Sequence, residues 1–199
     1  MDMDIILMID ISGSMNGHKI SAVTDALENL KESLVNYSYD NGPVRICVQF
    51  FSRDVSWFHE VPILIEDFQW EEPFCTGMTS LGKACSFLSD FLQKKELSDV
   101  IKIILMSDGC PTDDYDEGLG TLTKLSIFNA ADRFDIGLGE EADIPSLVKF
   151  TSDANKVFQV TELDKLMDCI TKAVVDNTPP LNSTPPSSPP NNNEADEWE

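Results

Sequence analysis

Basic residues are scarce in this chain of 199 residues. It holds 14 Lys and Arg against 35 Asp and Glu, which gives a formal net charge of −21. A surface this acidic repels phosphate backbones, so nucleic acid is excluded as a general partner, and divalent cations or basic protein surfaces are favoured. Long apolar runs are also missing, because none approaches the ~20 residues that cross a bilayer. We therefore expect no membrane partner.

The common patterns for structural metals, nucleotides and secretion are absent as well. The five cysteines are scattered and show no CxxC spacing, which argues against a zinc or disulfide framework. Neither GxxxxGK[ST] nor GxGxxG occurs, so nucleotide binding has no support. The first four residues carry acid where a secretory signal carries base. The expected location is the cytoplasm.

Apolar runs and helical stripes alternate along the chain. Ile5–Ile9 and Ile103–Met106 are unbroken apolar runs, which are typical of strands buried on both faces of a parallel sheet. The pattern also predicts strands over residues 44–51, 55–58, 134–138 and 157–160, and helices over residues 20–34, 81–92, 144–148 and 163–174. Such alternation predicts a doubly wound α/β fold, with helices on both faces of a mostly parallel sheet. A hairpin turn at residues 52–54 predicts one antiparallel edge strand.

The composition changes near residue 178, which divides the chain into a domain of residues 1–178 and a tail of residues 179–199. The tail holds six of the eleven prolines, no Lys or Arg, and many Ser and Asn residues. It cannot bury enough apolar area to offset its ordering entropy, so we expect a disordered, acidic tail with local polyproline II structure. Thr184 and Ser188 each precede a proline and are candidate phosphorylation sites.

Both unbroken apolar runs end in an acidic residue. The first leads to Asp10, Ser12 and Ser14 at alternate positions, and the second leads to Asp108. In an open parallel sheet, ligands bind in the crevice beyond the carboxyl ends of the strands, so we expect Asp10 and Asp108 to meet there. Carboxylate and hydroxyl oxygens without sulfur or imidazole suit Mg²⁺. The pattern therefore predicts a magnesium site.

A third oxygen-rich loop, residues 75–82, precedes the second predicted helix. The hydroxyl of Thr79 could supply another oxygen at the start of this helix, and Thr76 and Ser80 are the alternatives. A lone DxSxS motif is more often a turn or a helix cap than a site. Three such loops at the ends of a predicted parallel sheet favour metal binding instead.

These three motifs, taken in order, resemble the von Willebrand factor A (VWA) family and its metal-ion-dependent adhesion site. The resemblance covers about residues 4–175 and implies a Rossmann-like sheet with one short antiparallel edge strand. It implies that Ser12, Ser14 and Thr79 bind Mg²⁺ or Mn²⁺ directly, and that Asp10 and Asp108 do so mostly through water. All five positions are filled in this sequence.

A narrower resemblance is to bacterial TerY-type VWA proteins of tellurite-resistance and stress systems. It rests on residues Met8–Met15 followed by Gly17, on residues Gly77–Gly82 and on residues Met106–Asp114, and residues Phe134–Gly139 fit it too. This resemblance implies a scaffold that bridges partner proteins, among them a Ser/Thr kinase and a phosphatase.

Neutral hydroxyl ligands leave a bound cation with much of its charge, so the ion can attract an Asp or Glu of a partner protein. We therefore expect a metal-dependent interaction module and not an enzyme. The two histidines, His18 and His59, are expected at the surface and not as general bases. One alternative is a Mg²⁺-dependent phosphohydrolase that uses Asp10 and Asp108, although Ser12 stands where its second carboxylate is needed. Another is an adaptor for an AAA+ machine such as a chelatase.

An acidic loop, residues 113–117, follows Asp108 closely. Acidic side chains are favourable at the N-terminus of a helix because they face its positive dipole end. We interpret the loop in this way. The alternative is a rim that selects a basic partner or holds a second cation.

Overall fold

The computed structural model describes residues 2–176, so Thr184, Ser188 and the predicted tail lie outside the described residues. The strands of this part form a single sheet in the order β3-β2-β1-β5-β6-β7, and β4 pairs with β2. The strands are β1 (Met3–Asp10), β2 (Val44–Phe51), β3 (Val55–Trp57), β4 (Ile63–Leu64), β5 (Val100–Ser107), β6 (Asp132–Leu138) and β7 (Val157–Val160).

The central strand β1 is buried along its whole length. It pairs in parallel with β2 on one side and with β5 on the other. Successive side chains point to opposite faces, so Ile5 and Leu7 enter one core and Ile6 and Met8 enter the other. This arrangement explains why the strand reads as an unbroken apolar run.

The predicted antiparallel edge strand is confirmed. Strand β3 returns antiparallel along β2 after a tight turn, in which the N–H of Ser52 donates to the carbonyl of Asp54 at 2.9 Å. The two-residue strand β4 also pairs antiparallel with β2, farther from this turn. The sequence did not indicate β4, because two residues are too few to show a periodic pattern.

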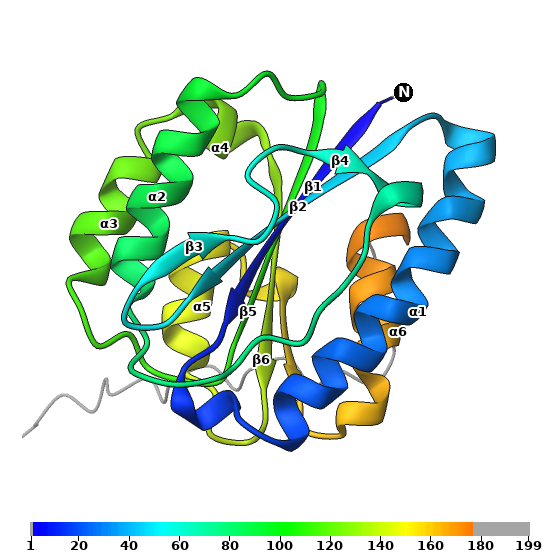
Figure 1. Ribbon diagram of the computed structural model, residues 1–199. Coiled ribbons are helices and arrows are strands. Elements are labelled where there is room, and N and C mark those ends of the chain that lie inside the picture. Colours follow the sequence, from blue (N-terminus) through cyan, green and yellow to red (C-terminus); the bar gives the residue numbers. More distant parts are fainter. Residues whose placement is uncertain (1, 177–199) are drawn as a thin grey trace, which may run out of the picture.

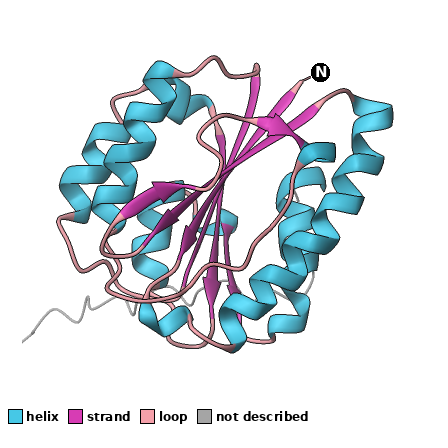
Figure 2. Ribbon diagram, in the orientation of Figure 1, coloured by secondary structure: helices cyan, strands magenta, loops and turns pink. Residues whose placement is uncertain are grey.

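Helices cover both faces of the sheet, as the alternating pattern predicted. Helices α1 and α6 pack on one face, and the remaining helices pack on the other (Figures 1 and 2). The helices are α1 (His18–Asn41), α2 (Leu81–Lys94), α3 (Tyr115–Leu122), α4 (Ser126–Ala130), α5 (Ile144–Thr151) and α6 (Leu166–Thr171). Within residues 2–176, no helix combines the length and the apolar character needed to cross a membrane.

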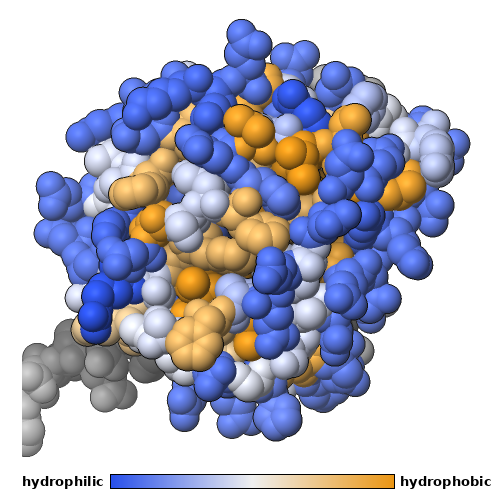
Figure 3. Space-filling model, viewed as in Figure 1, coloured by the Kyte–Doolittle hydropathy of each residue, from blue (hydrophilic) through white to orange (hydrophobic). Residues whose placement is uncertain are grey.

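The strand order reverses between β1 and β5. From β1 the chain passes through α1 to β2 on one side, whereas the later strands β5, β6 and β7 extend the sheet on the other side. The loops that leave β1 and β5 therefore diverge from one crevice, which is where open α/β sheets bind ligands. In Figure 3, hydrophilic side chains surround the edge of this face, and apolar side chains gather over its middle. In the same view of Figure 1, β3, β4 and the loop that follows β4 cross in front of the sheet there.

Candidate metal centre

Asp10 is the last residue of β1, and its carboxylate is held from two sides. One oxygen, Oδ1, accepts a hydrogen bond of 2.7 Å from the N–H of Ser12, and Oδ2 accepts one of 2.6 Å from the hydroxyl of Ser107. Burial raises the pKa of the Asp10 carboxyl; these hydrogen bonds oppose the rise, and the charge of Asp108 adds to it. A cation beside Asp10 would relieve this unfavourable buried charge.

The two serines of the first loop connect Asp10 to Asp108. A 3₁₀ turn over Gly13–Met15 brings the side-chain oxygens of Ser12 and Ser14 within 3.1 Å of each other. The hydroxyl of Ser14 donates a hydrogen bond of 2.8 Å to Oδ1 of Asp108. Ser12 and Asp108 are buried, whereas Ser14 is exposed, so the cluster reaches solvent at Ser14.

Backbone hydrogen bonds hold the third loop against the first. The N–H of Thr76 donates to the carbonyl of Ile11 at 2.8 Å, and the N–H of Gly13 donates to the carbonyl of Gly77 at 3.1 Å. Gly77 has a φ of 87°, a backbone conformation that residues other than glycine rarely adopt. These two bonds place the third loop directly beside the DxSxS loop.

Thr79, in the third loop, lies beside the residue that follows Asp108. Its side chain is buried, and a Cβ built at Gly109 would lie 3.2 Å from its Oγ1. The Thr79 hydroxyl therefore lies next to the backbone that follows Asp108. Of the alternative residues, Thr76 is exposed, and Ser80 occupies the N-cap position of α2, where its side chain makes no capping hydrogen bond.

These oxygen-bearing side chains fit a hard divalent cation. The structure gathers two carboxylates and three hydroxyls at one edge of the sheet, from Asp10, Ser12, Ser14, Thr79 and Asp108. Within residues 2–176, no cluster of three or more His, Cys, Asp or Glu side chains forms an alternative metal site. A donor set of oxygens with few carboxylates suits Mg²⁺, which keeps several of its waters.

Two residues outside the predicted set of oxygen donors contact these carboxylates. Lys19, in the first turn of α1, forms an ion pair with Oδ2 of Asp108. Ser107 belonged to a predicted motif, but its hydrogen bond to Asp10 was not foreseen. The available signal for Lys19 was a basic residue just after the DxSxS loop, at the start of a helix.

The two histidines differ in exposure. His18 is exposed at the start of α1, as expected. The expectation of an exposed His59 is wrong, because its ring is half-buried between Phe58 and Phe68, at 4.5 and 5.6 Å between ring centroids. The tilted aromatic packing of the segment after β3 explains this burial.

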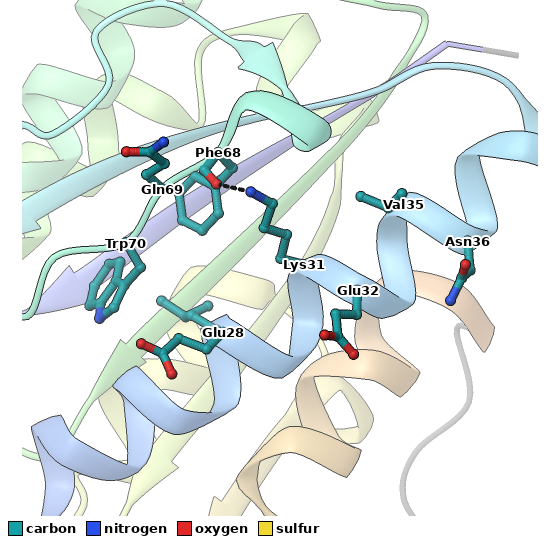
Figure 4. Close-up of a pocket in the computed structure, with 9 residues that line it drawn as sticks. Glu28, Lys31, Glu32, Val35, Asn36, Phe68, Gln69 and Trp70 are labelled. Carbon is teal, nitrogen blue, oxygen red and sulfur yellow. Dashed lines mark hydrogen bonds between the residues drawn. The ribbon is translucent and has the colours of Figure 1, made fainter.

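A separate surface groove lies between α1 and the segment that follows β4 (Figure 4). Its walls include Glu28, Glu32 and Trp70, and the ammonium of Lys31 crosses it to donate a hydrogen bond of 2.6 Å to the carbonyl of Phe68. Lys31, the only basic residue among those that line the groove, thus already donates a hydrogen bond within the protein. The groove shares no residue with the metal centre.

Comparisons with known proteins identify the family but not the biological role. A model of the von Willebrand factor type A domain matches residues 4–172. None of the curated proteins compared with the chain matches it.

Solved structures show the same fold at low sequence identity. VWA2, an ArnB paralog from Sulfolobus acidocaldarius, is 23% identical with a TM-score of 0.63, over 85% of this chain and 44% of that one. Proximal thread matrix protein 1 from the mussel byssus is 19% identical with a TM-score of 0.66, over 86% and 46%. The pilus adhesin SpaC from Lactobacillus rhamnosus GG is 14% identical with a TM-score of 0.69, over 87% and 30%.

This chain therefore spans less than half the length of these solved chains. One structure of the mussel protein has zinc in its metal-ion-dependent adhesion site motif. Domains of this family are typically adhesion or protein-interaction modules, and those with the adhesion site bind divalent metal. The family model covers most of the sequence, and the mixed sheet has the order and edge strand described above. The chain belongs to the von Willebrand factor type A domain family.

Proposed function

We propose that this domain binds a protein partner through a divalent cation, Mg²⁺ or Mn²⁺, held at the candidate metal centre. The observation that carries the proposal is the hydrogen-bonded series Ser12–Ser14–Asp108, which joins the ends of β1 and β5 in front of the buried Asp10. Oxygen donors from both strands thus share one opening to solvent. A cation placed there would supply a coordination position that a carboxylate oxygen of a partner can fill.

The neutral and the charged side chains of the site would contribute to cation binding in different ways. Hydroxyls of Ser12, Ser14 and Thr79 would face the cation as neutral donors. The carboxylates of Asp10 and Asp108 would balance its charge from behind. Because few anionic ligands are available, the cation would remain attractive to an Asp or Glu from outside, and metal and partner would each strengthen binding of the other.

The surface around the site also supports a protein partner. Phe74 and Met78 lie in the loop that carries Thr79, and their exposed fractions of 82% and 52% are high for apolar side chains. Arg53 is exposed and lies against the same loop, since a Cβ at Gly77 would come 3.5 Å from its Cβ. An apolar and basic margin beside a cation suits an acidic segment that also carries apolar side chains.

Binding accounts for these residues better than catalysis does, so we propose that the domain is not an enzyme. Both oxygens of Asp10 accept hydrogen bonds, which leaves it poorly placed as a nucleophile. His59 is half-buried among aromatic rings and His18 is exposed on α1, and neither is among the hydrogen-bond partners of Asp10 and Asp108, which are serines and Lys19. A Mg²⁺-dependent phosphohydrolase remains the second candidate, because Asp10 ends β1 and Asp108 directly follows the neighbouring strand β5.

The partner proposal extends to the complex in which the domain works. The motif resemblance to TerY-type proteins favours a scaffold for a kinase and a phosphatase in a stress or signalling complex. An adaptor for an AAA+ machine is the competing assembly. Co-purification with a kinase would support the first, and co-purification with an ATPase would support the second.

A matched pair of substitutions at Thr79 tests the proposed function. Thr79→Ala removes one hydroxyl from the site, and Thr79→Ser keeps it, while the backbone bonds of the loop stay in place. We expect Mg²⁺ and Mn²⁺ binding, measured by isothermal titration calorimetry, to be lost or to weaken at least tenfold in Thr79→Ala and to persist in Thr79→Ser.

Two further measurements decide between binding and hydrolysis. Pull-down from a lysate of the source cells should recover the same partner with wild type and Thr79→Ser in Mg²⁺, and lose it in EDTA or with Thr79→Ala. Capture that is equal under all four conditions would overturn the proposal. Turnover of p-nitrophenyl phosphate that depends on Mg²⁺ and on Asp10 would favour the phosphohydrolase.

A further inference from the structure

Asp108 already has a cation of the chain's own beside it. Its Oδ1 accepts the hydrogen bond from Ser14, while its Oδ2 forms the ion pair with Nζ of Lys19. The Asp108 side chain is 1% exposed and that of Lys19 is 25% exposed. A carboxylate this buried needs a compensating positive charge, and Lys19 supplies it.

The position of Lys19 is set by two different elements. It belongs to the first turn of α1, so the DxSxS loop and the lysine are joined by a short connection. The end of its side chain runs past Gly139, where a Cβ would lie 3.3 Å from Cε and 3.6 Å from Nζ of the lysine. Gly139 follows β6 and has a φ of 94°, so this position disfavours a larger residue that would push the ammonium away.

We propose that Lys19 is a tethered cation that neutralises Asp108 when no divalent ion is bound and competes with that ion for the carboxylate. This inference rests on the proposed function, because it concerns the affinity of the same site. The ammonium engages Oδ2 of Asp108, the oxygen that the hydroxyl of Ser14 does not bond. A divalent ion carries twice its charge and can displace it, but only by giving up part of its binding free energy to break the ion pair.

Two opposite effects follow from this arrangement. Without Lys19, Asp108 is left as an uncompensated buried charge, so the metal-free protein becomes less stable. Without Lys19, the cation has no competitor, so its affinity rises. A residue that only supported the fold would lower stability and would not increase metal affinity.

The test compares Lys19→Met with Lys19→Arg. Methionine keeps a long apolar side chain beside Gly139 and removes the charge, and arginine keeps the charge. Lys94→Met serves as the control for net charge, because Lys94 pairs with Asp90 at an exposed position on α2. Mg²⁺ affinity is measured by calorimetry at constant ionic strength, and the thermal midpoint is measured in EDTA and in saturating Mg²⁺.

We expect Lys19→Met to bind Mg²⁺ about tenfold more tightly than wild type, a factor equivalent to ~1.4 kcal/mol. Its midpoint should lie below that of wild type in EDTA and recover in Mg²⁺, whereas Lys19→Arg and Lys94→Met should resemble wild type in affinity. Tight binding in Lys19→Met with no detectable binding in wild type would also support the inference, as complete competition.

Mg²⁺ affinity in Lys19→Met that is unchanged or weaker would overturn the inference. If Thr79→Ala still loses binding in that case, the proposed metal site stands and only the competition fails. If neither wild type nor Lys19→Met binds Mg²⁺ or Mn²⁺, both the inference and the proposed function fail.

Discussion

Asp135 places a carboxyl group inside the sheet without compensation. It lies on β6, its side chain is fully buried, and neither oxygen has a hydrogen-bond partner within residues 2–176. Burial raises the pKa of Asp135 well above its ordinary value of 3.8, and the charge of Arg133 opposes this rise. The residue therefore opposes folding near neutral pH.

We predict that Asp135→Asn stabilises the protein at pH 7 and that the gain disappears in acid. Because the folded pKa is raised, between pH 3.8 and that folded pKa the native state holds a proton that the unfolded state releases. Stability consequently falls as the pH rises through this window. Asparagine does not titrate, so we expect a gain of roughly 1 kcal/mol or more at pH 7 and little gain near pH 4. Thermal unfolding between pH 4 and pH 8 measures the difference.

Asp132, on the same strand, provides the contrasting case. Its carboxylate lies 3.4 Å from Nζ of Lys102 and 2.5 Å from Nζ of Lys156. The Lys102 side chain is only 7% exposed, so Asp132→Asn removes a charge partner from a buried ammonium and should lower stability at neutral pH.

A stability gain from Asp135→Asn that did not change with pH would contradict the explanation given for Asp135.

For single residues, the sequence predicts a role where the residue type and its position in the predicted fold both indicate that role. Asp10 and Asp108 each follow an apolar run, and strand topology alone predicts that they meet. The partner of Asp108 could not be predicted in this way, because Lys19 is 89 positions away and its direction depends on packing against Gly139. The lack of a hydrogen-bond partner for Asp135 could not be predicted from the sequence either, because it depends on which donors the folded core places near its carboxyl group.

Helices α2 and α3 pack so closely that their backbones touch. A Cβ at Gly82 would come 2.3 Å from the carbonyl oxygen of Asp114, and one at Gly118 would come 2.0 Å from the carbonyl oxygen of Gly82. Asp113 adds to this contact, because its carboxylate accepts the N–H groups of Gly82 and Lys83 at 2.9 and 2.8 Å. Helix α2 therefore starts, two residues after Thr79, at a position fixed by the loop that follows Asp108.

A pair of glycines in α3 tests this close packing. Gly118→Ala should cost about 1–3 kcal/mol, because the new methyl group meets the backbone of α2, which cannot move aside as a side chain would. Gly120→Ala has nothing within 4 Å of its new Cβ and should stabilise the helix by up to ~1 kcal/mol. Urea denaturation measures both. Equal effects at the two positions would show that helix propensity, and not contact with α2, dominates.

Elements with a clear apolar pattern were predictable, whereas the short elements β4 and α4 were not. Strands β2 and β7 have the predicted bounds, and α1 contains the predicted apolar stripe. The interpretation of the acidic loop as a helix N-terminus is confirmed, since α3 starts at Tyr115 with Asp116 and Glu117 in its first turn; Asp114 also caps it by accepting the N–H of Glu117 at 3.0 Å. In contrast, α4 has five residues, which is too short for helical periodicity to stand out from chance.

Acidic charge dominates the molecule as a whole. The net charge of −21 reflects 35 acidic against 14 basic residues, and within residues 2–176 few acidic side chains are buried as Asp108 is. Most of this charge repels itself through solvent, and salt weakens such repulsion, because the screening length falls from about 30 Å at 0.01 M to about 10 Å at 0.1 M ionic strength. Any added salt should therefore stabilise the fold to some degree, whether or not it binds the candidate metal centre.

Matched ionic strength separates this general screening from binding at the site. A ligand present at about 100 times its Kd stabilises the native state by ~2.7 kcal/mol, and about 1 kcal/mol shifts the thermal midpoint of a chain of this size by roughly 2–4 °C. We therefore predict that saturating MgCl₂ raises the midpoint of wild type about 5–10 °C above its value in NaCl of equal ionic strength. In Thr79→Ala the two salts should act almost alike, because screening remains and the site has lost a ligand. An equal Mg²⁺ advantage in both proteins would mean that the cation acts on the acidic surface at large and not at the crevice between β1 and β5.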